Sequence, residues 1–274
     1  MAKLLEFPST PGKTALIGGL RARIGTLERA GHHAMGTAGR AAGPATLPLG
    51  VAALDRALPG GGLVLGRLHE VAGPDAGSAA AMGFCAMLLA RLSARGPVLW
   101  VARRPDIHAP GFAAFAPAAT GARGSHHAFA FGRLIAVRAR RREEILWAME
   151  EGLRAPALSA VLGEVPSIGL TASRRLQLAA EAHGVTGLLL SPGRADALPP
   201  TAATTRWRVA AAPSRPASPW GGVGPARWRV ELLRCRGGRP DTWILEWCDE
   251  TRDLALVPPL RDRPADPAPA ALAV

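Results

Sequence analysis

A glycine-rich turn lies between an apolar segment and a helix-forming segment in HEVAGPDAGSAAAMGF, residues 69–84. A strand, turn and helix in this order offer backbone N–H groups and a helix N-terminus to phosphate oxygens. A working phosphate loop adds a lysine for the outer phosphates and a serine or threonine hydroxyl for Mg²⁺. This stretch contains no lysine. The residues therefore predict the geometry of a phosphate loop without its charged side chain.

The elements that would position this loop follow it as alternating apolar strands and helices. Strands are expected over 67–73, 97–103, 133–139, 158–165 and 186–192, with helices over 78–95, 141–155 and 171–184. Such alternation predicts a mainly parallel sheet with helices on both faces. After a proline-containing loop, the segments TRWRVAAAP, ARWRVELLRCRGG and DTWILEWCDE predict antiparallel C-terminal strands.

Composition limits the classes of protein that fit. Of the 274 residues 48% are hydrophobic, which is enough for a sizeable core, and no apolar run approaches the roughly 20 residues that span a bilayer. The start, MAKLLEFPSTPGKT, lacks the apolar core of a secretion signal, so we expect a cytoplasmic protein. Three widely spaced cysteines form no ligand cluster, and neither a disulfide scaffold nor a metal site is expected.

The net charge of +12 favours polyanionic partners, with nucleic acid first. All but two of the 33 basic residues are arginine, and the chain is rich in Ala, Gly and Pro and has no Tyr. A GC-rich genome explains this composition equally well, so the charge alone selects no partner.

Four regions are expected along the chain. Residues 1–30 are interpreted as an N-terminal arm, because Leu16, Leu20, Ile24 and Leu27 recur at helical spacing. Residues 31–46 have the composition of a linker, 47–257 form the core, and 258–274 are a tail rich in Pro and Ala.

The order of segments resembles the core of the RecA superfamily. In LPLGVAALDRALPGGGLVLGRLHEVAGPDAGSAAA, residues 47–81, the shared features are Leu54–Asp55, Gly60–Gly62, Gly66–Arg67 and Gly73–Pro74–Asp75. Within that superfamily, RARRREEILWAMEEGLR and AVLGEVPSI resemble the ImuA family of accessory proteins, which act in DNA-damage-induced mutagenesis and translesion synthesis. The resemblance implies a RecA-like P-loop NTPase core with a degenerate phosphate loop.

The resemblance also implies where nucleotide groups would lie. Gly73, Asp75 and Gly77 keep the loop, Ser78 replaces its second glycine, and Ala79 and Ala80 replace the lysine and the hydroxyl. Arg103 stands near the place of the glutamate that orients water, and an arginine cannot act as a base there. Glu164 lies near the place of the Mg²⁺-associated aspartate; a strand-end acid bonded to its neighbours is the alternative interpretation. We expect no catalysis and no cofactor beyond weak ATP binding.

Contacts with DNA or a partner have several candidates. The RecA-type DNA loops would follow Glu164 and span 191–205, but the first is short and the second has one arginine. The remaining candidates are Arg174, Arg175, Arg206, Trp207, Arg208, Arg227, Arg229 and the apolar residues of the arm. Arginines beside tryptophan could combine phosphate contacts with base stacking, whereas alternation in a strand usually turns the tryptophan inward and the arginine outward. The cluster at 138–144 is either a solvated strand exit and helix start or a basic contact surface.

The resemblance implies a non-catalytic accessory protein that binds an ImuB-like Y-family partner and, through it, an error-prone C-family polymerase. Binding to RecA or to a second copy is a further expectation. Two alternatives remain: an ATP-binding, DNA-stimulated RecA-type regulator, and a SulA-like inhibitor of cell division. Fold alone does not choose among them.

Overall fold

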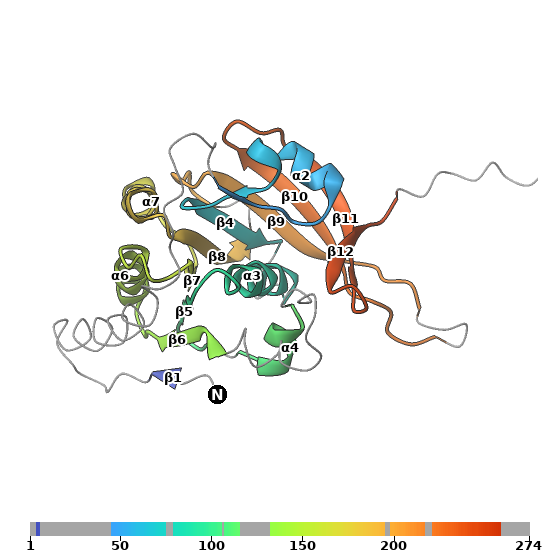
Figure 1. Ribbon diagram of the computed structural model, residues 1–274, viewed down its shortest axis with the longest axis horizontal. Helices are drawn as coiled ribbons and strands as arrows, with labels where there is room; N and C mark the ends of the chain where they lie inside the picture. The colour runs from blue at the N-terminus through green and yellow to red at the C-terminus, as the bar shows by residue number, and fades with distance from the viewer. Residues whose placement is uncertain are drawn as a thin grey trace, which may run out of the picture.

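A computed structural model describes residues 4–5, 45–74, 79–105, 107–115, 132–194, 198–216 and 221–258. Its main element is a ten-stranded sheet in the order β1-β6-β5-β7-β8-β4-β9-β10-β11-β12 (Figure 1). A second sheet pairs only β2 (Thr46–Leu47) with β3 (Leu63–Val64). In the part of the chain that is described, no helix is long and apolar enough to cross a membrane.

The centre of the large sheet is parallel. It consists of β4 (Leu68–Gly73), β5 (Val98–Ala102), β6 (Leu134–Arg138), β7 (Ala160–Glu164) and β8 (Thr186–Arg194). Nearly every residue of β4 to β7 is buried, because helices cover both faces of these strands. The expected parallel sheet is confirmed, although β8 continues to Arg194, into the segment predicted to be a loop.

Helices pack against the two faces of this sheet (Figure 1). On one face lies α3 (Ala79–Leu92), ten of whose residues are buried; on the other lie α6 (Arg142–Leu153) and α7 (Leu170–His183). The helix α7 ends at Gly184, whose φ of 72° lies in the left-handed region that glycine adopts without strain. The shorter elements are α2 (Ala52–Ala57), the 3₁₀ helix η1 (Pro59–Gly61) and α4 (Ala109–Ala114).

The C-terminal strands extend the sheet beyond β4. The first of them, β9 (Thr205–Ala212), runs parallel to β4 and antiparallel to β10 (Arg227–Cys235). The strands β11 (Asp241–Cys248) and β12 (Asp253–Leu256) complete the antiparallel part. Alternate residues of β9 and β10 are buried, which is the pattern of strands with one covered face.

Five short elements were not predicted. They are α4, the β2–β3 pair, β12 and β1 (Leu4–Leu5). The strand β1 lies in the predicted arm and pairs in parallel with β6 at the sheet edge. Short strands at an edge carry too few residues for a periodic pattern, so the sequence gives no sign of them.

The core has one apolar cluster on each side of the sheet. The cluster around α3 includes Phe84, Trp207 and Trp228, with ring centroids of Phe84 5.9 and 6.3 Å from the two tryptophans. The buried His69 bridges strands through its ring nitrogens, which lie 2.8 Å from the Val64 carbonyl oxygen and 2.8 Å from Thr205 Oγ1. Burial lowers the pKa of His69 to about 4.

Candidate functional site

The predicted phosphate loop connects β4 to α3 at the carboxyl end of the parallel strands, where ligands of open α/β sheets bind. Gly73 is the last residue of β4 and pairs with Arg194 after an irregularity in the β4–β8 register. Asp75, Gly77 and Ser78 lie outside the described residues, so their predicted place in a phosphate site stays a prediction.

The first turn of α3 begins with Ala79, which is exposed, and Ala80, which is buried. No acidic side chain lies in this turn, and its residues, AAAM, carry no base and no hydroxyl. Within this turn, an anion would therefore meet backbone N–H groups and no polar side chain. The rest of α3 belongs to the core, where the buried thiol of Cys85 has its pKa raised by desolvation and by the charge of Glu164.

Glu164 ends β7 and is bonded to the neighbouring strand. Its Oε1 accepts a hydrogen bond from the indole Nε1 of Trp100, at 2.6 Å, and Trp100 is only 3% exposed. A carboxylate in this position satisfies a buried donor, as the strand-end interpretation of Glu164 expects. Within the described part of the chain, no group of three or more His, Cys, Asp or Glu side chains could hold a metal ion.

The tryptophans of β9 and β10, the strands in which tryptophan lies beside arginine, point into the core. Trp207 is 0% exposed and Trp228 is 7% exposed. Trp207 also donates a hydrogen bond from Nε1 to Thr205 Oγ1, at 2.7 Å. Neither ring can stack on a nucleic-acid base, so Trp207 as a contact residue is wrong, and the inward arrangement of tryptophan is the one observed.

Arg206 is half of a buried ion pair. Its Nε lies 2.8 Å from Oε2 of Glu70, and the two side chains are 14% and 1% exposed. Oε2 also accepts a hydrogen bond from Thr201 Oγ1 at 2.8 Å, while an Nη of Arg206 donates to the Pro199 carbonyl at 2.6 Å. Arg206 on β9 therefore bonds both to Glu70 on β4 and to Pro199, in the segment just before β9. Its positive charge is compensated inside the protein by Glu70.

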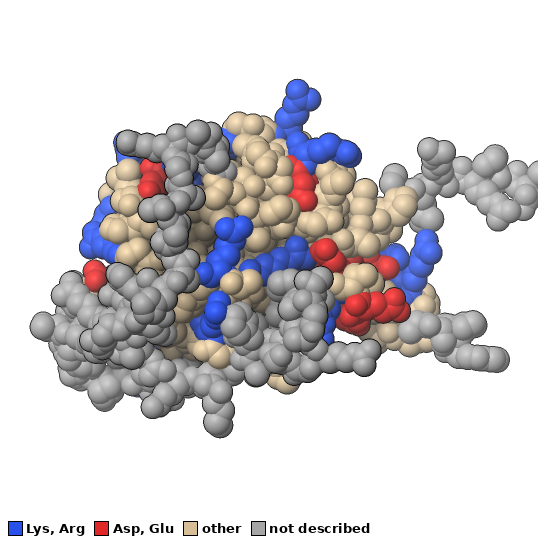
Figure 2. Space-filling model, in the orientation of Figure 1, with Lys and Arg blue, Asp and Glu red and all other residues tan. Residues whose placement is uncertain are grey.

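Three more arginines of these strands, Arg208, Arg227 and Arg229, also face acids on the sheet. Arg208 pairs with Glu231, which lies directly opposite it on β10, and Arg227 pairs with Glu246 on β11. Arg229 lies 3.6 Å from Glu231 and is 58% exposed. On the face seen in Figure 2, acidic side chains accompany basic ones over the C-terminal strands. These arginines form a compensated surface rather than a purely basic one.

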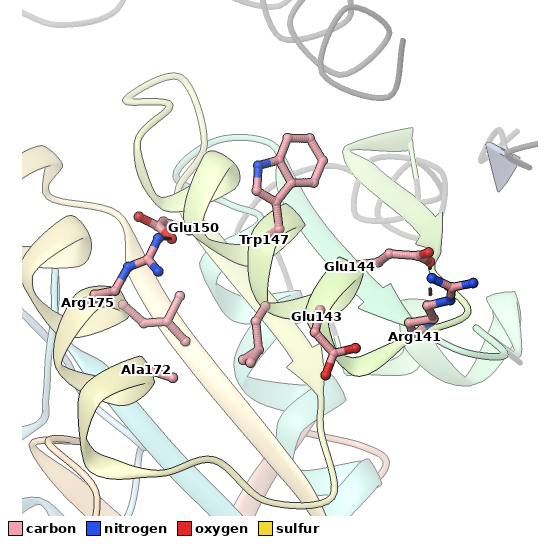
Figure 3. A pocket seen from close by; sticks show the side chains of 9 residues that line it. Arg141, Glu143, Glu144, Trp147, Glu150, Ala172 and Arg175 are labelled. Atoms are coloured by element: carbon pink, nitrogen blue, oxygen red, sulfur yellow. Dashed lines mark hydrogen bonds and ion pairs between the residues drawn. The ribbon is translucent and has the colours of Figure 1, made fainter. Parts of the chain in front are cut away.

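A groove of about 500 Å³ is lined by side chains of α6 and α7 and by Arg141 just before α6. At one end Glu150 bonds to Arg175 across the two helices and to Arg154 on its own helix, the latter at 2.6 Å. Figure 3 shows Glu150 and Arg175 pointing toward each other, with Trp147 projecting from α6 between them and the start of the helix. Arg175 thus has a structural partner, whereas Arg174 is exposed one residue earlier. The arm residues Leu16, Leu20, Ile24 and Leu27 lie outside the described residues.

The chain is a RecA-like α/β protein. Its sheet is mainly parallel, and the segment from residue 47 through β4 leads into α3 as the phosphate-loop segment of that fold does. The RadB recombinase crystal structure is similar, with a TM-score of 0.52 and 16% identity over 76% of this chain and 98% of that chain, which shows the fold. Protein ImuA of Caulobacter vibrioides, in strains NA1000 / CB15N and ATCC 19089 / CIP 103742 / CB 15, is 43% identical over 213 residues, covering 73% of this chain and 82% of that protein. The chain belongs to the ImuA family. No family model matches the sequence.

Proposed function

We propose that this chain is a non-catalytic accessory protein of DNA-damage-induced mutagenesis. It acts by binding other proteins, chiefly an ImuB-like protein of the Y family, and through it an error-prone C-family polymerase in translesion synthesis. Membership of the ImuA family supports the mutagenesis role. The non-catalytic part is supported by the start of α3 with Ala79 and Ala80, because the RecA resemblance aligns these two alanines with the lysine and the metal-binding hydroxyl.

The energetic consequence of these two alanines is large for phosphoryl transfer. A hydrogen bond to a charged group contributes about 1.5–3 kcal/mol, and a lysine at the γ-phosphate also stabilises the charge that develops in the transition state. Glu164, which the resemblance places near the Mg²⁺-associated aspartate, already accepts a hydrogen bond from the indole of Trp100. Weak anion binding by the backbone of α3 is compatible with the proposal, but hydrolysis is not.

Partner contact is assigned to the arm, residues 1–30, with the tail as second choice. The arm carries an apolar face of Leu16, Leu20, Ile24 and Leu27 at helical spacing, which suits packing into a groove of another protein. Such a face anchors binding through a few buried side chains.

Co-purification with the ImuB-like protein of the same organism tests the function. The full chain should retain that protein, and replacement of the four apolar arm residues by serine should reduce retention strongly. A matched variant, Arg21→Ser with Glu28→Ser, changes the polar side of the same segment without altering net charge and should bind as the unmodified chain does.

Other outcomes select the alternatives. If the full chain fails to retain the ImuB-like protein, the bridging role is wrong. Nucleotide-dependent thermal stabilisation would favour the ATP-binding regulator, because a ligand of the native state raises its stability by mass action. Retention of a tubulin-like division protein instead of a polymerase subunit would favour the SulA-like inhibitor.

A further inference from the structure

Two groups of arginines differ in whether acidic side chains face them. Arg206, Arg208, Arg227 and Arg229 of β9 and β10 face Glu70, Glu231 and Glu246, as described above. A second group lies where β5 and β6 end. It comprises Arg103, Arg104, Arg140, Arg141 and Arg142, all exposed, and we call it the arginine edge.

Strand pairing brings the two halves of the arginine edge together. β5 and β6 are parallel neighbours, with Ala102 opposite Arg138, and the N–H of Ala139 donates to the Ala102 carbonyl at 2.9 Å. The segments that follow β5 and β6 therefore leave the sheet at the same end, the carboxyl end of the strands. They begin about 4.8 Å apart, since that is the spacing of neighbouring strands. Arg103 and Arg104 follow directly on one strand, and Arg140 begins the arginine run after the other.

The two acids in the first turn of α6 form no ion pair with the described arginines of this edge, and Asp106, two residues after Arg104, lies outside the described residues. Oε2 of Glu144 accepts hydrogen bonds from the backbone N–H groups of Arg140 and Arg141, at 2.8 and 3.2 Å, and so caps the start of α6. Glu143 is the other acid of that first turn. Among the residues that the structure describes, no ion pair joins a guanidinium group of the arginine edge to a carboxylate. The described acids near these strand ends are Glu143, Glu144 and Glu164, the last of which accepts a hydrogen bond from Trp100, so the five arginines outnumber them.

We propose that the arginine edge binds the phosphate backbone of DNA, without reading its bases. Five guanidinium groups at two adjacent strand ends form a dense array of charge. DNA is the polyanion of matching density, with about one phosphate charge per 1.7 Å of duplex axis. Guanidinium also donates paired hydrogen bonds to phosphate oxygens. This surface lies beyond β5 and β6, away from Arg206, Arg208, Arg227 and Arg229.

Fluorescence anisotropy tests the proposal. It measures the binding of a labelled DNA single strand, and of a DNA duplex of equal length, over a range of salt concentrations. The slope of log affinity against log salt changes by about 0.7 per phosphate contact for a single strand and about 0.9 for a duplex. The variant Arg103→Gln with Arg104→Gln should therefore lose roughly 1.4 from the slope on a single strand, or roughly 1.8 on a duplex. Arg140→Gln with Arg142→Gln should have a similar effect.

The control removes the same charge from another surface. Arg236 and Arg239 are exposed beside the turn between β10 and β11, and their double replacement by glutamine should leave affinity and slope close to those of the unmodified chain. Unchanged thermal midpoints of all three variants exclude unfolding as the cause. Absence of DNA binding at low salt, or an equal loss in the control, would overturn the proposal. Neither result depends on whether the ImuB-like protein is bound, so the two proposals can fail separately.

Discussion

Removal of the Arg206 side chain should destabilise the protein through the buried charge that it leaves behind. In Arg206→Ala, Glu70 would keep Thr201 as a partner but lose the cation 2.8 Å away, while its side chain remains 1% exposed. Removing one member of a buried ion pair costs about 3–5 kcal/mol. For a domain of this size each kcal/mol lowers the thermal midpoint by about 2–4 °C, so we expect a fall of roughly 6–20 °C.

Urea unfolding and thermal unfolding measure this effect, and two further variants identify its cause. Arg229→Ala removes an arginine that is 58% exposed and 3.6 Å from Glu231, and such surface pairs contribute about 0–1 kcal/mol. Glu70→Gln with Arg206→Ala leaves no charge buried and should recover much of the loss. A cost for Arg206→Ala no larger than that of Arg229→Ala would refute the reasoning.

Three other substitutions or conditions have defined outcomes. The pKa of His69 falls from 6.5 to about 4 on folding, so below pH 6.5 the unfolded chain binds a proton that the native state does not, and stability falls as the pH drops toward 4. Urea titrations should show about 2 kcal/mol lost at this site between pH 7 and pH 5; if His69→Gln shows the same loss, His69 is not its source. Glu164→Ala leaves the buried Trp100 indole without its acceptor and should cost about 1–3 kcal/mol, while Glu164→Gln, which keeps an acceptor, should cost less. Equal costs for the two variants would exclude this hydrogen bond as the reason. Gly163→Ala should destabilise by about 1–3 kcal/mol in the same assay, because the added Cβ would overlap Met149 Sδ; a neutral result would mean that Met149 moves aside.

The parallel core was predictable because its strands are buried on both faces. Continuous apolar runs such as those of β5 and β7, separated by helical segments, leave few other folds. The parallel pairing of β9 with β4 was not predictable, since it joins segments far apart in sequence through backbone hydrogen bonds that carry no residue signal. The edge strand β1 was missed because its two residues are too few to form a periodic pattern.

The surface chemistry depended on strand register. Alternation in β9 favoured an inward Trp207, but its sequence does not say which residue of β10 stands opposite Arg208. Only the register places Glu231 there. Similarly, Arg103 and Arg140 lie far apart in the chain and follow adjacent strand ends because β5 and β6 are neighbours. Sequence patterns therefore identified the arginines, while the topology determined which of them are compensated.

ATP hydrolysis by the purified full chain, in the presence of Mg²⁺ and with or without single-stranded DNA, tests the non-catalytic account most directly. Because α3 begins with Ala79 and Ala80, the account predicts a phosphate release rate equal to that of buffer, with or without DNA. A rate above buffer that Ser78→Asp abolishes would contradict it, because the predicted phosphate loop would then be a working site.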